Sequence, residues 1–566
     1  MRNEVFYMNY LVEKTFEHRG ITWDDYVAYE NSSHGFLKDV DILCAELHKI
    51  QAEGRHIVIL SDFDMDGIAS GVCGFAGLSE LGFHVSLYIP NVSNGYGFTE
   101  DDIDKIRAQY PDVYAIITCD VGIACYDAID YANYIGIHML VTDHHIQKEL
   151  KNHADVIVNP MRLDETYAHP SICGAYVMFQ VLERYAQLYH SGTTLPLQIA
   201  RLAVFAGIGT ISDSMPLLYE NRKLVRDAVS ILKLCWEENL LSHMTGCSVY
   251  RAAFQGLRNV LLLFSNMGKL ESLDDIDEEF FGYYFAPMFN SAKRMNGDMS
   301  RVFGIFFGNQ SYADAEYLYE LNRQRKIEAA DAFEAMLAND QPFAPFIYFS
   351  DARAGILGLL AQDVMKQTGM PALVVALDKN KGSYHGSGRS PVWYRFLDQT
   401  NGIIYAEGHN PAFGVGFPNY AAILVAFAFL KQDVYDIYNT LPADTFTPNY
   451  DFTISTNGTG DIGIDIMEFR LYLDDIVNYK PFGKGFPAPN ILFEYDAHFI
   501  ESAKRMGKAG EHLKLVFFDG FSVLLFYQGE LCDKAQEPGI HKISGHLALN
   551  EFRGQTSVDF IGDFLE

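Results

Sequence analysis

The sequence predicts a multidomain protein of the α/β class, in which a parallel-sheet domain is followed by a helical connector, a smaller α/β domain and a C-terminal β-barrel. Short β-branched segments alternate with helical segments from residue 56 to residue 159, and this alternation is typical of a parallel sheet covered by helices on both faces. Residues 221–340 have helical periodicity, and strand and helix signals return at 345–430. Beyond residue 440, short strands at nearly even spacing indicate a small barrel or sandwich.

Five short apolar runs are the expected strands of the first domain. They cover residues 56–60, 84–89, 114–119, 138–142 and 154–159. The expected helices beside them cover residues 67–82, 99–109, 125–136, 172–190 and 198–211. Residues 1–50 read as helical packing elements without a chemical motif, and residues 320–337 as a long connector helix. The apolar run 420–430 is too short for a bilayer, which takes about 20 residues, and is predicted to be a buried helix.

The composition excludes several classes of protein. Apolar residues make up 49% of the 566 residues, which is enough to build cores and excludes a disordered chain. The formal net charge of −30 argues against non-specific coating of polyanions, so any nucleic-acid contact must use a local basic face or bound metal ions. The eight cysteines show no C-x-x-C spacing and read as reduced thiols. The N-terminal residues contain no signal-like apolar run, so we expect a cytoplasmic protein without membrane contact.

Acidic and imidazole side chains follow the ends of three expected strands. They are Asp62, Asp64, Asp66, Asp120, Asp143, His144 and His145, and Asp213 ends a further apolar segment. In an open parallel sheet, ligands collect beyond the carboxyl ends of the strands. Taken singly, each cluster has an ordinary explanation, because an Asp after a strand is usually a helix cap and adjacent histidines are usually polar surface.

Together these clusters predict a site for divalent cations, because so many acids in one crevice would repel one another unless cations neutralised them. Carboxylates with one or two imidazoles and no thiolate favour Mn²⁺ or Mg²⁺ over structural zinc. A calcium EF-hand loop is excluded, since Cys73 stands where its glutamate would be. The set is large enough for two ions that share a bridging carboxylate. The predicted chemistry is metal-assisted hydrolysis of a phosphoester or phosphoanhydride.

Four of these segments resemble the metal-binding motifs of the DHH phosphoesterase family and, within it, of the RecJ group of single-strand-specific exonucleases. They are SDFDMDG (61–67), TCDVG (118–122), TDHH (142–145) and GTISDSMPL (209–217). The similarity continues through residues 285–295, 321–326, 386–390, 407–414, 481–493, 510–517 and 547–555. It implies an N-terminal helical segment (1–50), a DHH catalytic domain (51–240), a helical region with the connector helix (241–344), a DHH-associated substrate domain (345–438) and an OB-like nucleic-acid-binding domain (439–566).

The resemblance assigns roles to individual residues. It places Asp64, Asp66, Asp120, His144 and Asp213 at metal-ligand positions, with Asp120 as the bridging ligand. Asp62 and His145 fall at catalytic positions beside the metals. The alternatives are a plain turn residue for Asp62 and a buried, hydrogen-bonded histidine for His145.

Substrate contacts are implied further along the chain, at Asn290, Arg294, Ser387, Arg389, Gly408 and His409. Ser387 and Arg389 are expected in a glycine-rich turn that holds a 5′-terminal phosphate, with a loose surface turn as the alternative. Asn290 and Arg294 are expected to face phosphates, although a structural ion pair is an equal alternative for Arg294. The sequence departs from the RecJ pattern twice: Glu407 replaces the first glycine of a G-G-H element, and residues 90–97 lack an arginine.

The predicted function is a two-ion, Mn²⁺- or Mg²⁺-dependent exonuclease that degrades single-stranded DNA from 5′ to 3′ in DNA repair, recombination or replication. A basic cluster with neighbouring aromatics indicates a single-strand-binding surface in the C-terminal domain. It comprises Lys504, Arg505, Lys508 and Lys514 with Phe499, Phe517, Phe518 and Phe521. The alternative is that the aromatics form the core and the lysines lie in solvent.

Single-stranded DNA is therefore the expected partner, with recruitment by a single-strand-binding protein or a helicase, and we expect a monomer. Two other functions stay open. One is a DHH phosphodiesterase for short oligonucleotides or cyclic dinucleotides, which the OB-like region argues against. The other is an inactive replication scaffold, which the complete set of ligand positions argues against.

Overall fold

The computed structural model describes residues 10–31, 35–89, 97–237, 244–442, 445, 449–456, 479–507, 509–518, 520–552 and 555–565. The chain forms two compact units. Unit 1 comprises Met1–Pro90, Tyr96–Tyr284 and Pro448–Glu566, and unit 2 comprises Asn91–Gly95 and Phe285–Thr447.

Unit 1 contains the parallel sheet that the sequence predicts. Its strands are β1 (His56–Ser61), β2 (Val85–Tyr88), β3 (Val113–Cys119), β4 (His138–Thr142) and β5 (Val156–Val158). They pair in the order β2-β1-β3-β4-β5, and every pairing is parallel. All residues of β1 are buried, as expected for a strand covered on both faces.

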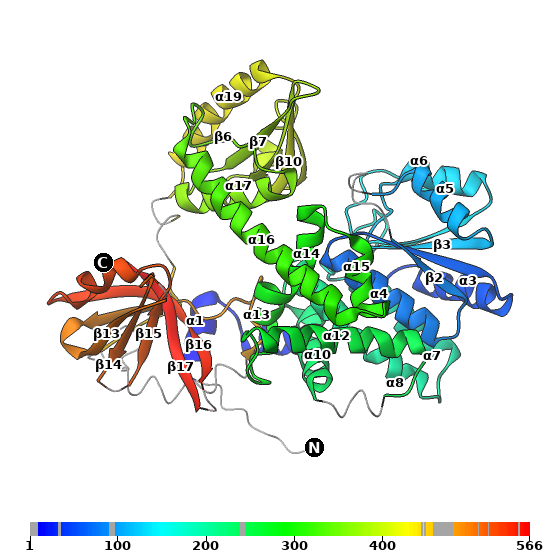
Figure 1. The fold of residues 1–566 in the computed structure, drawn as a ribbon, viewed down its shortest axis with the longest axis horizontal. Helices are drawn as coiled ribbons and strands as arrows, with labels where there is room; N and C mark the ends of the chain where they lie inside the picture. Colours follow the sequence, from blue (N-terminus) through cyan, green and yellow to red (C-terminus); the bar gives the residue numbers. More distant parts are fainter. Residues whose placement is uncertain are drawn as a thin grey trace. The chain divides into compact units, whose positions relative to one another are not determined.

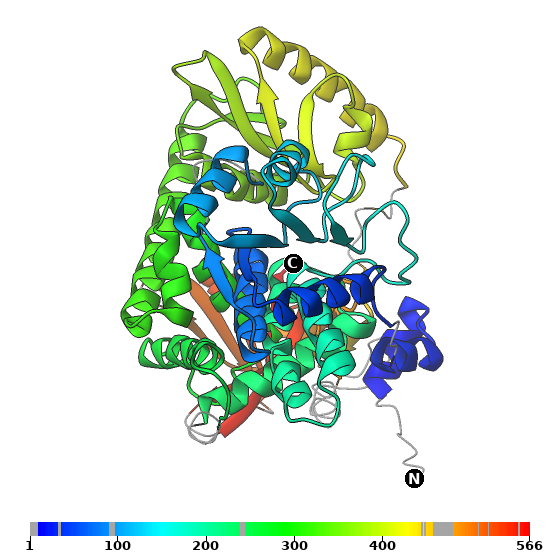
Figure 2. The same cartoon turned by 90° about the vertical axis from the view of Figure 1, so that its right-hand side faces the viewer.

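Helices cover this sheet on both faces (Figures 1 and 2). One face buries Val58, Ile116 and Val141 against α5 (Glu100–Gln109) and α6 (Tyr126–Tyr134). The other carries α3 (Val40–Ala52), α4 (Met65–Glu80) and α7 (Gly174–Tyr189). The remaining helices of this region are α8 (Leu195–Ala200), α9 (Ala203–Ser212), α10 (Tyr219–Trp236), α12 (Ser248–Asn266), α13 (Glu278–Phe280) and the π-helix η2 (Phe281–Phe285). The predicted α/β class and the helices flanking the strands are thus confirmed.

In the part of the chain that the structure describes, one stretch has the length and hydropathy of a membrane-crossing helix. It is Leu195–Ser212, which consists of α8 and α9, and 61% of it is buried inside the protein.

A second sheet of unit 1 lies in the C-terminal region. Its seven strands pair in the order β11-β12-β16-β17-β15-β14-β13. They are β11 (Phe452–Ser455), β12 (Ile491–Asp496), β13 (Ile500–Met506), β14 (His512–Phe517), β15 (Ser522–Leu525), β16 (Ile540–Phe552) and β17 (Gln555–Phe564), with short 3₁₀ helices η5 (Ala497–Phe499), η6 (Gly529–Cys532) and η7 (Lys534–Gln536). Phe517 and Phe521 belong to its core, so placing them on a binding surface was wrong. Phe499 and Phe518 are 41% and 68% exposed.

The N-terminal helices α1 (Tyr10–Arg19) and α2 (Trp23–Asn31) complete the core of this C-terminal sheet. Leu11, Phe16 and Tyr26 pack in one cluster with Phe486 and Phe493. The next helix, α3, packs instead on α7 and β5. Chain segments from opposite ends of the sequence therefore bury one another's apolar side chains.

Unit 2 is built on a mixed five-stranded sheet in the order β6-β7-β8-β10-β9. Its elements are α14 (Ala286–Met295), α15 (Met299–Phe307), α16 (Ser311–Ala338), β6 (Ile347–Phe349), α17 (Ala354–Thr368), β7 (Ala372–Asp378), β8 (Ser383–Arg389), α18 (Phe396–Gln399), β9 (Tyr405–His409), β10 (Ala412–Phe417) and α19 (Tyr420–Tyr438). Along β7 the side chains alternate: Val374 packs with α17, and Leu373 and Val375 pack with α19 on the other face (Figure 1).

Two sequence expectations for unit 2 have clear outcomes. The connector helix is present as α16, which is longer than the predicted segment 320–337. The run 420–430 forms the start of α19, but its complete burial was wrong. Ile423 and Leu430 are buried, whereas Leu424 and Val425 are 48% and 62% exposed, because only one side of the helix meets the sheet.

Arg222 on α10 ties three distant segments of unit 1 together. Its guanidinium is fully buried and donates to the carbonyl oxygens of Pro481, at 2.6 Å, and Tyr479, and to the Glu30 carboxylate. It also lies 4.1 Å from the centre of the Phe486 ring, in a cation–π contact. One side chain of α10 thus satisfies groups from α2 and from the segment preceding β12.

We expect Arg222→Met to destabilise unit 1 by about 2–4 kcal/mol, because two buried carbonyl groups lose their charged donor and Glu30 keeps only Arg226 as a cationic partner. Urea denaturation followed by circular dichroism measures the change. The matched control is Lys223→Met, whose side chain is 70% exposed and should not shift the midpoint. A wild-type midpoint for the Arg222 variant would contradict the proposed anchoring.

Candidate metal centre

Every residue predicted as a metal ligand or catalytic group lies in unit 1, near the carboxyl edge of the parallel sheet. Asp62 and Asp64 follow β1, Asp120 follows β3, and His144 and His145 follow β4. Asp66 lies in the first turn of α4. Asp213 comes from the C-terminal end of α9, which packs on α4 and α7, so this residue reaches the site from a helix and not from a strand end.

These side chains form three overlapping groups whose ligand atoms lie within 4.8 Å of one another. The groups are Asp62-Asp64-Asp120, Asp120-His144-His145 and Asp66-His144-Asp213. Asp120 and His144 each belong to two groups. Shared ligands between adjacent groups are what a pair of divalent ions requires.

His144 is held in the orientation that ligation needs. Its Nδ1 lies 2.9 Å from the carbonyl oxygen of Ile172, which can only accept, so Nδ1 carries the proton. The other nitrogen, Nε2, therefore faces the carboxylates with its lone pair. It lies 3.1 Å from Asp120 Oδ1, 3.6 Å from Asp213 Oδ2 and 3.7 Å from Asp66 Oδ2.

Asp143 is a residue of the site to which the sequence analysis assigned no role. It is fully buried, and its Oδ1 lies 2.8 Å from His145 Nδ1 and accepts from the backbone N–H groups of His144 and His145. Burial disfavours a charged His145, but the hydrogen bond to Asp143 and its charge outweigh burial and raise the pKa of His145 to about 9. The signal was present in the sequence, since Asp143 directly precedes the two histidines.

Two glycines leave room for the carboxylates. Asp66 accepts hydrogen bonds from the backbone N–H groups of Gly174, at 2.6 Å, and Ala175, at 3.0 Å, in the first turn of α7. A Cβ on Gly174 would lie 2.5 Å from Asp120 Cβ, and one on Gly209 would lie 2.3 Å from Asp66 Oδ1. Larger residues at either position would displace a carboxylate, so glycine is needed there for space.

The electrostatics of the site favour a bound cation. Oδ1 of Asp120 is buried and makes no hydrogen bond within the described part of the chain. Burial, reinforced by neighbouring Asp66, raises the pKa of Asp120 well above its usual range and that of Asp213 to about 7. Divalent cations would stabilise the ionised carboxylates, and this donor set of carboxylates and imidazole suits Mn²⁺ or Mg²⁺.

The predicted substrate residues all lie in unit 2. Asn290 and Arg294 are four positions apart on α14 and so share one face of that helix. Ser387 and Arg389 lie on β8, a central strand, so their placement in a glycine-rich turn was wrong. The neighbouring glycines serve packing, since a Cβ on Gly386 or Gly388 would lie 2.2 Å from Val374 O or 2.1 Å from the Phe413 ring.

Gly408 lies in β9 with a φ of 136°, where its missing Cβ prevents a clash with Ala412 O. His409 pairs with Ala412 through its backbone, and its side chain lies outside the described residues. The same holds for residues 90–96, where the RecJ-type arginine is missing from the sequence.

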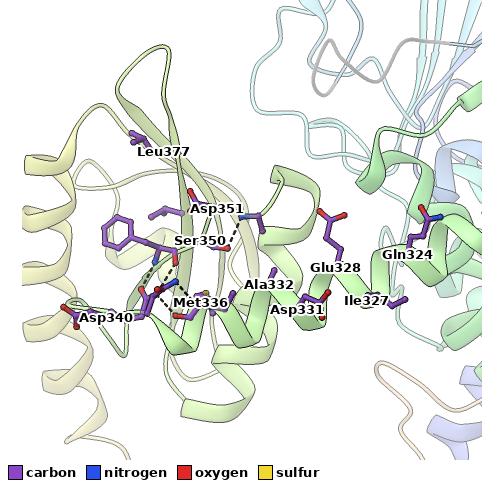
Figure 3. A pocket seen from close by; sticks show the side chains of 16 residues that line it. Gln324, Ile327, Glu328, Asp331, Ala332, Met336, Asp340, Ser350, Asp351 and Leu377 are labelled. Carbon is purple, nitrogen blue, oxygen red and sulfur yellow. Dashed lines mark hydrogen bonds between the residues drawn. The ribbon is translucent and has the colours of Figure 1, made fainter.

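A pocket of about 660 Å³ in unit 2 has a different character (Figure 3). It lies along α16, and four carboxylates line it: Glu328, Asp331, Asp340 and Asp351. No Lys or Arg is among the lining residues that the structure describes. Such a pocket repels a polyanion, so it is not a candidate site for the phosphates of a nucleic acid.

Comparison with known families agrees with this geometry. The model of the DHH family, N-terminal domain, matches residues 56–208, and that of the RecJ OB domain matches residues 461–562. The chain is therefore similar to the DHH family in its parallel-sheet region and to RecJ over most of its length, as its sequence motifs predicted.

Relatives match over nearly the whole chain. The single-stranded-DNA-specific exonuclease RecJ of Haemophilus influenzae is 26% identical, over 95% of this chain and 91% of its own. RecJ of Escherichia coli is 25% identical, over 94% and 90%. The crystal structure of Thermus thermophilus RecJ in complex with Mn²⁺ matches with a TM-score of 0.70 at 21% identity, over 99% of this chain and 76% of that chain. The Mg²⁺ complex of the same protein gives a TM-score of 0.66.

We expect Asp120→Asn to lower hydrolysis at least about a hundredfold, because the variant loses charge at the position shared by two ligand groups. Asn tolerates the left-handed φ of 63° that Asp120 adopts, so the backbone should not change. In EDTA the unfolding temperature of the variant should equal or exceed that of the wild type, since one repelling charge is gone. Mn²⁺ should then stabilise the wild type and not the variant.

The control is Asp127→Asn on the exposed side of α6, which should behave as the wild type in both assays. Normal Mn²⁺ stabilisation of a well-folded Asp120→Asn variant would contradict the assignment of Asp120 as a ligand.

Proposed function

We infer that this protein is an Mn²⁺- or Mg²⁺-dependent exonuclease that hydrolyses single-stranded DNA from 5′ to 3′ in DNA repair, recombination or replication. The observation that carries this inference is the set of three overlapping ligand groups, in which Asp120 and His144 each belong to two. The relatives that match most of the chain are single-stranded-DNA-specific exonucleases, and this supports the substrate class.

Each residue of the centre has a defined part in hydrolysis. Asp64, Asp66, Asp120, His144 and Asp213 would hold two ions, which would activate water and stabilise negative charge on the scissile phosphate. His145, kept protonated by Asp143, presents a positively charged ring beside Asp120 and contacts a phosphate oxygen. Asp62 lies within the same group of carboxylates and orients the attacking water.

The C-terminal sheet offers a surface for single-stranded DNA. Lys504 on β13 lies directly opposite Lys514 on β14. The pair places two positive charges side by side on one face of the sheet, which suits contact with a polyanion. Arg505 follows Lys504 on β13, is exposed and pairs with Asp533 at 3.6 Å, and Lys508 lies outside the described residues.

Exposed aromatics accompany these charges. Phe518 donates its backbone N–H to the Phe499 carbonyl at 3.1 Å, so the backbones of these two exposed residues are adjacent. Phe526 and Tyr527 are also exposed and flank His512. Aromatic rings beside a basic pair of β-strands allow DNA bases to stack on them while the lysines neutralise the phosphate backbone. Such binding does not depend on the DNA sequence.

Two other functions are less well supported. A phosphodiesterase for short oligonucleotides or cyclic dinucleotides has no need of the matched OB domain. An inactive replication scaffold would have no reason to keep a complete set of ligand groups. We further propose that the protein acts as a monomer in the cytoplasm and that a single-strand-binding protein or a helicase delivers its substrate.

The decisive experiment is degradation of single strands labelled at the 5′ or the 3′ end, with Mn²⁺, Mg²⁺ or EDTA. We expect early release of a labelled mononucleotide from the 5′-labelled strand, gradual shortening of the 3′-labelled strand, and no reaction in EDTA. Duplex DNA of the same sequence is the control. Release from the 3′ end would overturn the polarity, and activity in EDTA would overturn the metal mechanism.

Changing both Lys504 and Lys514 to Ala should weaken binding to long single strands about tenfold. The slope of log K against log salt concentration should become shallower by about two, one for each lost phosphate contact. Cleavage of a dinucleotide should change much less, since the metal centre is untouched. Lys534→Ala in the same domain is the control, because Lys534 contacts the Phe564 ring. Equal losses on the long strand and the dinucleotide would mean that the pair has a structural role only.

A further inference from the structure

Three side chains with metal-ligating atoms meet at the amino edge of the parallel sheet, at the opposite end of the strands from the metal centre. They are His56, His84 and Asp112, and their ligand atoms lie within 4.8 Å of one another. His56 is the first residue of β1, and the other two directly precede β2 and β3. Because these strands are neighbours in the order β2-β1-β3, strand pairing itself brings the three side chains together.

His56 is the buried centre of this group. It is 5% exposed, its Nδ1 lies 2.9 Å from Asp112 Oδ1, and its Nε2 lies 2.9 Å from Ser86 Oγ. The ring of His84 stacks on the ring of His56, with 4.1 Å between the ring centres. His84 and Asp112 are both exposed, so an ion can reach the group from solvent.

Ser86 gives His56 a partner in both of its neutral tautomers. An ionised carboxylate only accepts, so without a metal Nδ1 carries the proton and donates to Asp112, and Nε2 accepts from the Ser86 hydroxyl. When Nδ1 ligates an ion, the ring proton moves to Nε2, which then donates to Ser86 Oγ. A hydroxyl group serves both states, and a ligating histidine usually has such a partner on its second nitrogen.

The donor set selects the metal. Two imidazoles and one carboxylate make a nitrogen-rich group, in contrast to the oxygen-rich metal centre. Zinc binds such ligands tetrahedrally at about 2.0–2.2 Å, which sets the ligand atoms about 3.3–3.6 Å apart and leaves the fourth position to water. His56 Nδ1 and Asp112 Oδ1 are already close to this spacing. The two stacked rings are nearly parallel, at 11°, so the exposed ring of His84 must turn out of the stack to complete the set.

We propose that His56, His84 and Asp112 bind one Zn²⁺ ion that joins the starts of β1, β2 and β3. The site is separate from the metal centre, because the six residues of β1 lie between them and span about 17 Å. It does not depend on the proposed nuclease activity. Ser86 is a positioning residue, since its hydroxyl holds the His56 ring in place.

Zinc binding is measured on the full chain by equilibrium dialysis against buffered free Zn²⁺, and the bound metal is counted by atomic absorption. The variants are His84→Ala and Asp112→Ala, both at exposed positions. The matched control is His153→Ala. His153 is also exposed and pairs with one carboxylate, that of Asp130 at 2.8 Å, but it belongs to no group of three ligands among the described residues.

We expect His84→Ala and Asp112→Ala each to bind one zinc ion fewer than the wild type, and His153→Ala to bind as many as the wild type. Ser86→Ala should keep the ion but bind it about tenfold more weakly, because the His56 ring loses its hydrogen-bond partner. Equal zinc counts in the wild type and His84→Ala, or the same loss in His153→Ala, would overturn the proposal.

A double variant separates this site from zinc that enters the metal centre. Because the two sites are independent, Asp120→Asn combined with His84→Ala should lose the sum of the two single losses. In EDTA, His84→Ala should have the circular dichroism spectrum and the unfolding temperature of the wild type, which shows that its loss of zinc is not a loss of fold. A double variant that binds as much zinc as Asp120→Asn alone would overturn the proposal, since the metal centre would then hold all of the zinc.

Discussion

The concentration of negative charge at the carboxyl edge of the parallel sheet constrains every element around it. Asp66 is tolerable in its buried position because the first turn of α7 donates two N–H groups to it. Asp120 adopts a left-handed backbone conformation at the end of β3, and Gly174 gives it space. The Ile172 carbonyl then fixes which nitrogen of His144 faces the acids. The packing of α7 and α9 on α4 is therefore as much a requirement of the site as of the core.

The two units hold clusters of buried charge of opposite sign. Unit 1 contains clustered carboxylates whose pKa values are raised by burial and mutual repulsion, and this arrangement favours the binding of cations. Unit 2 contains Arg325 and Arg389, whose pKa values are lowered by burial and by the charge of Arg294, and this arrangement favours the binding of anions. A chain with a net charge of −30 can thus contact a polyanion through a few local sites while most of its surface repels non-specific binding.

The sequence predicted the parallel sheet and the metal ligands because both follow from local patterns: apolar runs end in acidic or imidazole residues. It failed where tertiary neighbours decide the outcome. Gly386 and Gly388 suggested a turn, yet they lie within a strand. These strand positions are glycines because Val374 and Phe413 leave no room for a Cβ. The burial of Phe517 depends on which face of β14 meets the core, and that face is set by strand pairing.

The shared core of α1, α2 and the C-terminal sheet has a consequence for biosynthesis. Leu11 and Phe16 leave the ribosome early, but the strands that cover them come from the last part of the chain to be made. At about 5–20 residues per second, the intervening roughly 400 residues take between about 20 and 80 seconds to translate. During this interval the apolar side of the first helices stays open to water and to other chains. Nascent protein should therefore depend on a chaperone that binds its N-terminal segment until translation is complete.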